Sequence, residues 1–226
     1  MEEKPRTDGA FIVMEYVEGR PITQACESCG VSIRQRVDLF RSVCSAVHYA
    51  HQKLVIHRDI KPSNVLVTPE GIVKLIDFGV SKPLAPELVP GESPKTESWQ
   101  RLMTPDFASP EQLQGKDLTT ASDIYSLGVL LFELLTGSRP YSLNELSPAA
   151  AERLVCEGDI RKPSSVRGLP DRVRKEVAGD LDKIVAKAMN QDPSRRYPSA
   201  QHFGEDLLCF LEGPILAQEP TLIYTN

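Results

Sequence analysis

Two carboxylates, one amide and one lysine are concentrated in two short runs between residues 57 and 79. The first run is His57-Arg58-Asp59-Ile60-Lys61-Pro62-Ser63-Asn64, and the second, Asp77-Phe78-Gly79, begins eighteen residues after Asp59. A carboxylate can receive a hydroxyl proton, and further oxygen ligands opposite it can hold magnesium. Phosphoryl transfer needs these groups, because its loose transition state requires positioning and charge neutralisation more than covalent chemistry. The two runs therefore predict a phosphoryl-transfer site.

A long helix and a hairpin are predicted on either side of the first run. Ser32 is a suitable N-cap, and the apolar residues after it recur in steps of three and four: Ile33, Val37, Phe40, Cys44 and Val47. This spacing predicts an amphipathic helix of about five turns. Short apolar runs at 65–67 and 73–76 are separated by a turn sequence, which predicts the two strands of a small hairpin. The first run then connects the helix to the hairpin.

The C-terminal half of the chain is helical in pattern. Residues 124–135 are apolar on nearly every face, which predicts a helix buried in the middle of a domain. Three more helices are predicted: one opening at Ser147, one over residues 181–189, and one from Ser199 to a stop at Gly213. The core is expected to form around the 124–135 helix.

The N-terminal part and the centre of the chain differ from this helical pattern. Residues 10–17 predict a strand that is stopped by Gly19 and Pro21, because Phe11, Ile12, Val13 and Met14 are apolar and mostly β-favouring. Residues 81–105 are rich in proline and polar side chains and predict a long loop, and loops of this length inside a domain are usually functional or disordered. The predicted fold class is α+β, mainly α.

Composition excludes several classes of protein. The chain has 226 residues, 41% of them apolar, so it can form a packed core. Its net charge of −5 does not indicate a nucleic-acid partner. The longest apolar stretch, residues 127–135, is far shorter than the roughly 20 residues of a membrane-spanning helix, and the N-terminus lacks a secretion signal. Five cysteines, an odd number, indicate reduced thiols, so a cytoplasmic location is expected.

The two runs resemble the H-R-D-x-K-x-x-N catalytic loop and the D-F-G motif of protein kinases. The resemblance implies that Asp59 accepts the proton of the substrate hydroxyl and that Lys61 lies against the transferring phosphate. It also implies that Asn64 and Asp77 hold Mg²⁺, with ATP as the phosphate donor. A lysine two places after Asp59 is similar to the serine/threonine branch of the family, which implies protein serine or threonine hydroxyls as substrates.

Further matches follow the order of the family along the chain. Met14-Glu15-Tyr16-Val17 resembles the hinge. The resemblance makes Met14 the gatekeeper, and the backbones of Glu15 and Val17 would hydrogen-bond adenine. Leu66 would pack under the adenine ring. Asp123 resembles the residue that anchors the backbone of the catalytic loop.

The long loop matches the activation segment. It closes at 104–111, where Ser-Pro-Glu replaces the usual Ala-Pro-Glu, and the resemblance implies that Thr104 hydrogen-bonds near Asp59. Glu111 and Arg196 resemble a buried ion pair. Arg58 is expected to gather a phosphorylated loop residue, one of Ser93, Thr96 and Ser98.

The matches extend over residues 11–211. Their residues are most similar to those of bacterial kinases of the eukaryotic type. We expect a short extension over residues 1–10, a kinase domain with hinge and C-terminal lobe over 11–213, and a tail over 214–226. A glycine-rich loop, a strand lysine and a helix glutamate need upward of roughly thirty residues, which residues 1–10 cannot hold. A missing segment or a partner would complete the small N-terminal lobe, and this polypeptide alone is expected to bind ATP weakly and to transfer phosphate slowly or not at all.

Other interpretations of these residues remain. The chain is alternatively a catalytically silent binding module of kinase fold. Cys26 and Cys29 resemble half of a zinc or redox site, although an ordinary helix-loop segment is favoured. His48 and His51 are interpreted as surface or lining residues because the sequence places no acidic partner beside them, and His57 is given a packing role.

Overall fold

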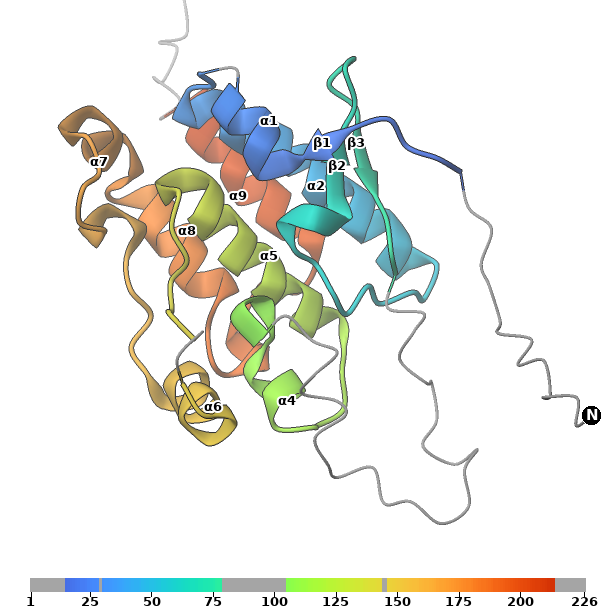
Figure 1. Cartoon of the computed structure of the whole chain (residues 1–226), viewed down its shortest axis with the longest axis vertical. Coiled ribbons are helices and arrows are strands. Elements are labelled where there is room, and N and C mark those ends of the chain that lie inside the picture. The colour runs from blue at the N-terminus through green and yellow to red at the C-terminus, as the bar shows by residue number, and fades with distance from the viewer. Residues whose placement is uncertain (1–14, 29, 79–104, 144–145, 214–226) are drawn as a thin grey trace, which may run out of the picture.

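The computed structural model describes residues 15–28, 30–78, 105–143 and 146–213. The predictions for Met14, for the loop over 81–104 and for the tail over 214–226 therefore lie outside the described residues. The sheet strands are β1 (Arg20–Pro21), β2 (Val65–Val67) and β3 (Val73–Leu75). The helices are α1 (Ile22–Ser28), α2 (Ile33–Gln52), α4 (Pro110–Leu113), α5 (Thr120–Thr136), α6 (Pro148–Glu157), α7 (Asp171–Val177), α8 (Asp180–Ala188) and α9 (Ala200–Glu212), as Figure 1 shows.

Helix α2 confirms the predicted amphipathic helix. Ser32 accepts a hydrogen bond from the Gln35 backbone, and the Gln35 side chain accepts one from the Ser32 backbone in return. This capping box satisfies two N–H groups that a helix start would leave unpaired. The predicted apolar stripe is buried, and α2 packs mainly against α9, with further contacts to α5 and β3.

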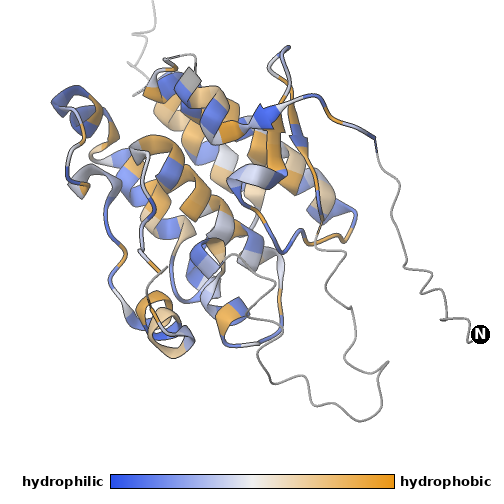
Figure 2. Cartoon of the chain, in the orientation of Figure 1, coloured by the Kyte–Doolittle hydropathy of each residue, from blue (hydrophilic) through white to orange (hydrophobic). Residues whose placement is uncertain are grey.

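Helix α5 forms the centre of the core, as predicted from its apolar sequence. Residues 122–132 are all buried, and hydrophobic side chains of α2, α8 and α9 join the same cluster. Figure 2 shows α5 as mainly hydrophobic along its length, with hydrophilic residues concentrated at the periphery. The helix ends at Gly137, whose backbone adopts the left-handed conformation with φ of 67°. None of the helices in the described ranges is long and apolar enough to cross a membrane.

The small sheet confirms the hairpin but corrects the first strand. Its order is β1-β2-β3 with both pairs antiparallel, and Leu66 of β2 lies opposite Pro21 on one side and Lys74 on the other. Residues 15–17 were predicted as strand but have no strand structure. The strand lies instead at Arg20–Pro21, where proline lacks the N–H group that a longer ladder would use.

Three helices were not predicted. Helices α1, α4 and α7 contain seven, four and seven residues, respectively. Two turns or fewer give too few apolar positions to reveal a 3.6-residue period. Helices α5, α8 and α9 begin and end within a few residues of the predicted positions, and α6 begins directly after the predicted start at Ser147.

Helices α5 and α8 approach closely at Gly128. A Cβ atom added there would lie 2.7 Å from Met189 Cγ and 2.9 Å from Ala188 Cβ, so one helix would have to move. Gly128→Ala should lower the free energy of unfolding by about 1–3 kcal/mol, measured by urea denaturation.

Gly204 provides the matched control on α9. A Cβ atom there would meet Cys44 Cβ at 3.5 Å, which is an ordinary contact. Gly204→Ala should leave stability unchanged or raise it by up to about 1 kcal/mol through helix propensity. Equal losses in both variants would show that helix spacing at Gly128 is not the constraint.

Candidate active site

The predicted catalytic run forms a compact loop between α2 and β2. Lys61 Nζ lies 2.9 Å from Asp59 Oδ2. Asn64 Nδ2 donates to the Asp59 carbonyl at 2.8 Å and to Asp59 Oδ2 at 3.2 Å. Asn64 sits in the 3-10 turn Pro62–Asn64 that leads directly into β2. The loop therefore brings three of the predicted site residues into direct contact.

A buried carboxylate from α5 holds the start of this loop. Asp123 Oδ2 accepts the His57 N–H at 2.8 Å, and Oδ1 accepts the Arg58 N–H at 2.8 Å. The same Oδ2 lies 2.8 Å from His51 Nε2 on α2, and the Asp123 side chain is only 1% exposed. Burying a carboxylate is costly unless its oxygens are hydrogen-bonded, and here both oxygens are. One side chain thereby joins two helices to the catalytic loop.

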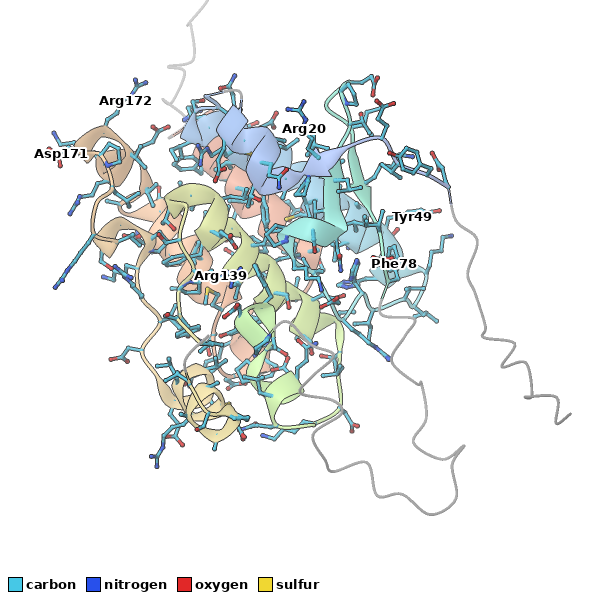
Figure 3. All side chains as sticks on the ribbon, in the orientation of Figure 1. Arg20, Tyr49, Phe78, Arg139, Asp171 and Arg172 are labelled. Carbon is cyan, nitrogen blue, oxygen red and sulfur yellow. The ribbon has the colours of Figure 1, made fainter. Side chains whose placement is uncertain are left out.

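His57 is a packing residue, as its sequence context predicted. Its ring lies against Phe78, with centroids 4.6 Å apart, and its Nε2 lies 3.1 Å from the Ile76 carbonyl oxygen (Figure 3 labels Phe78). Burial lowers the pKa of His57 below its ordinary value, despite the opposing effects of the Asp123 and Asp59 carboxylates. A neutral ring is consistent with these partners, since Nδ1 accepts the Asp59 N–H at 3.4 Å.

The second predicted run leaves the hairpin beside Asn64. The Ile76 N–H donates to the Asn64 carbonyl at 3.0 Å, so Asp77 follows directly on a residue bonded to the catalytic loop. Asp77 is exposed and adopts a left-handed backbone with φ of 55°. The described residues contain no group of three His, Cys, Asp or Glu side chains that could hold a metal ion. The oxygen ligands of Asn64 and Asp77 nevertheless have the chemistry that Mg²⁺ prefers.

The predicted adenine-binding residues are described only in part. Met14 lies outside the described residues. Glu15 is exposed, with Oε1 3.9 Å from Lys74 Nζ of β3, and Val17 is half-buried. A Cβ atom on Gly19 would lie 3.1 Å from the Val67 carbonyl oxygen and 3.2 Å from Leu66 Cβ. The segment after Val17 therefore passes close over β2, which carries Leu66.

The segment after the long loop is bound to the catalytic loop and to the core. Thr104 lies outside the described residues. Gln112 Nε2 donates to the Arg58 carbonyl at 2.8 Å, and Ser126 Oγ donates to the Phe107 carbonyl at 2.8 Å. Arg139, labelled in Figure 3, forms an ion pair with Asp106 and lies over the Phe107 ring. Contacts with the catalytic loop, with α5 and with the loop after α5 thus fix this segment.

The predicted ion pair between Glu111 and Arg196 is present and buried. Arg196 Nη1 and Nη2 donate to the two Glu111 oxygens at 2.7 and 2.9 Å, and Arg196 also donates to the carbonyls of Asn190, Gln191 and Ala121. Burial alone would raise the pKa of Glu111, but the hydrogen bonds and charge of Arg196 outweigh it and lower the pKa. The pair ties α4 to the turn before α9.

Sequence reasoning missed three residues of this arrangement. His51 was interpreted as a surface or lining residue without an acidic partner, but the structure places it against Asp123 with a side chain 6% exposed. The sequence did indicate this position, because His51 lies four residues after Val47 and therefore on the same buried side of α2. Gln112 and Arg139 had no such signal, since both act across loops whose paths no periodicity predicts.

Comparison with known proteins identifies the class to which this fold and loop belong. The sequence profile of the protein kinase domain matches residues 3–207. The chain therefore belongs to the protein kinase family.

Bacterial serine/threonine kinases are among the curated relatives. Serine/threonine-protein kinase PknB of Mycolicibacterium smegmatis is 33% identical over 212 residues, which are 93% of this chain and 32% of that protein. PrkC of Bacillus subtilis is 34% identical over 198 residues, which are 87% of this chain and 28% of that protein. This chain thus spans about a third of the length of these relatives.

A solved structure supports the fold. The crystal structure of the Mycobacterium tuberculosis PknI kinase domain matches with a TM-score of 0.60 and 24% sequence identity, covering 87% of this chain and 64% of that chain. The predicted resemblance to bacterial kinases of the eukaryotic type is confirmed by these relatives, and the predicted mainly helical α+β fold by the structure.

Replacing His51 should weaken the anchor at Asp123. His51→Leu keeps an apolar volume but removes one hydrogen bond from a buried carboxylate, so the free energy of unfolding should fall by about 1–3 kcal/mol. His48→Leu, one turn earlier and bonded to Gln52 on the surface, should change it by less than about 0.5 kcal/mol. Urea denaturation of both variants measures the difference, and equal effects would argue against the anchoring role.

Replacing Glu111 should leave Arg196 buried without its charged partner. Glu111→Gln should cost about 3 kcal/mol of stability at pH 7, and Glu157→Gln in the exposed Arg153 pair less than about 0.5 kcal/mol. Because folding lowers the pKa of Glu111, its contribution is complete above the ordinary value of 4.5 and is lost as pH falls through the lowered value. A cost of Glu111→Gln that stays constant from pH 7 to pH 3 would contradict this.

Proposed function

We propose that this chain is the catalytic part of a serine/threonine protein kinase that transfers the γ-phosphate of ATP to protein hydroxyls. The observation that carries the proposal is the contact of Asp59 with both Lys61 and Asn64 in one loop. A base, a cation and an amide ligand converge there, as a phosphoryl-transfer site requires. The family membership and the bacterial serine/threonine kinases among its relatives support the same reaction.

Asp59 orients the substrate hydroxyl and accepts its proton in this proposal. Its side chain is 22% exposed, so solvent and substrate can reach the carboxylate. Two hydrogen bonds restrict the orientation of Asp59. The Asn64 amide donates to its carboxylate, and its backbone N–H donates to His57 Nδ1. Lys61, at 2.9 Å, moves from this carboxylate toward the transferring phosphate when substrates bind and neutralises the charge that develops there.

Asn64 and Asp77 are the proposed Mg²⁺ ligands. Mg²⁺ with ATP would supply charge neutralisation at the β- and γ-phosphates. The backbone bond between Ile76 and Asn64 supports this assignment, because it ties the two ligand-bearing segments together. We also assign the adenine contacts to the backbones of Glu15 and Val17 and to the side chains of Met14 and Leu66, and a hydrogen bond near Asp59 to Thr104. The kinase domain is proposed to cover residues 11–213.

The proposal is tested by transfer of labelled phosphate from Mg²⁺-ATP to serine- and threonine-containing acceptor peptides. Asp59→Asn should lower the rate at least about 100-fold, because the amide cannot accept the proton. Mg²⁺-ATP binding, measured by calorimetry, should change less than twofold. The control Arg153→Gln lies in an exposed ion pair and should change neither quantity.

Two outcomes would count against the proposal. Transfer that survives Asp59→Asn unchanged would remove the carboxylate from the reaction. Nucleotide-independent binding of peptides with no transfer by any form would instead indicate the silent binding module.

A further inference from the structure

A strongly basic surface covers the segment between α6 and α8. Residues 161–176 contain six Lys or Arg and two Asp or Glu, although the whole chain has a net charge of −5. All six cationic residues are exposed. The basic surface consists of Arg161, Lys162, Arg167, Arg172, Arg174 and Lys175.

The fold brings these residues onto neighbouring segments. Helix α7 packs against the 3-10 turn Pro163–Ser165, so the cations before that turn lie beside those on the helix. Within α7, Val173 and Val177 face the core, while Arg172, Arg174 and Lys175 occupy the opposite arc. Figure 3 shows Arg172 at the outer edge of the molecule, and Figure 2 shows α7 as mainly hydrophilic.

The basic surface lacks internal counter-ions. None of its six residues forms an ion pair with any residue that the structure describes, although Asp171 is the first residue of α7. Three exposed cations elsewhere in the described part of the chain do have partners: Arg153 pairs with Glu157, Lys183 with Asp180 and Arg195 with Asp192. The positive charge of this segment is therefore available to an external anion.

We infer that the basic surface binds an acidic peptide segment of a partner protein. Four of its six cations are arginines, whose planar guanidinium groups match carboxylates with two hydrogen bonds each. Helix α7 is about 10 Å long, which an extended segment of three or four residues spans. The rest of the chain is acidic, so a short segment that meets only this surface gains attraction without the repulsion that a larger polyanion would meet.

Other polyanions fit the surface less well. Residues 161–177 contain no aromatic side chain on which bases of a single-stranded nucleic acid could stack. None of the exposed large hydrophobic side chains in the described part of the chain lies in this segment, so nothing there would insert into a membrane.

The surface lies away from the candidate active site. Figure 1 places α7 at one edge of the molecule, with α5 between it and the loop that joins α2 to β2. Binding at α7 therefore does not require the catalytic loop, and its test is independent of phosphate transfer.

The test is the fluorescence anisotropy of a fluorescein-labelled octapeptide rich in Asp and Glu, titrated with the purified chain. The variant Arg172→Gln/Arg174→Gln/Lys175→Gln should bind about tenfold more weakly. The control Arg153→Gln/Lys183→Gln/Arg195→Gln removes the same charge from paired cations and should bind within twofold of the wild type. Thermal unfolding establishes that both variants fold, and Asp59→Asn should bind like the wild type.

Three results would overturn the inference. The first is unchanged binding by the α7 variant, and the second is an equal loss in the paired-cation control, which would indicate only net charge. The third is tighter binding to vesicles of anionic lipid or to duplex DNA than to the peptide, lost in the α7 variant, which would assign the surface to another class of partner. Weakening of peptide binding between 0.05 and 0.5 M salt, as screening predicts, supports the inference.

Discussion

The arrangement of the candidate site depends on one buried carboxylate. Asp123 belongs to the first turn of α5, and its oxygens accept the backbone N–H groups of His57 and Arg58 and contact the His51 ring. A loop cannot hold its own shape without such bonds, because its backbone groups have no ladder or helix to satisfy them. Asp59 follows directly on the two residues that this carboxylate holds.

Three further contacts extend the anchored region. Gln112 donates to the Arg58 carbonyl, and the Glu111 side chain beside it is held by Arg196. Ile76 bonds to Asn64 from the other side. The catalytic loop therefore lies between a segment fixed to the C-terminal helices and a segment fixed to the hairpin. A loop held in place on both sides suits phosphoryl transfer, in which positioning of the reacting groups contributes much of the catalysis.

The sequence predicted those parts of the fold that repeat a pattern over several turns or alternate between clear turn signals. Helix α2 begins at the predicted cap Ser32, α5 is buried as its apolar run required, and the hairpin lies between the predicted strands. Short helices were not predicted, because a helix such as α4, with only four residues, is too short to show a helical period. The strand at Arg20–Pro21 depends on pairing with β2, a long-range contact that no local pattern reveals. In the site, motif spacing located Asp59, Lys61, Asn64 and Asp123, whereas Arg139 meets Asp106 through the folding of a loop.

The backbone conformations around the site have a consequence for its dependence on the core. The non-glycine residues with positive φ among those described are Leu54, Arg58 and Asp77, and all three flank or belong to the catalytic loop and hairpin. Such conformations cost of order 1–3 kcal/mol each and persist only where the surroundings impose them. Of the three, Arg58 is held in this conformation by α5, because Asp123 accepts its backbone N–H. A disturbance that moves the start of α5 would therefore release Arg58 from this conformation and displace the adjoining Asp59.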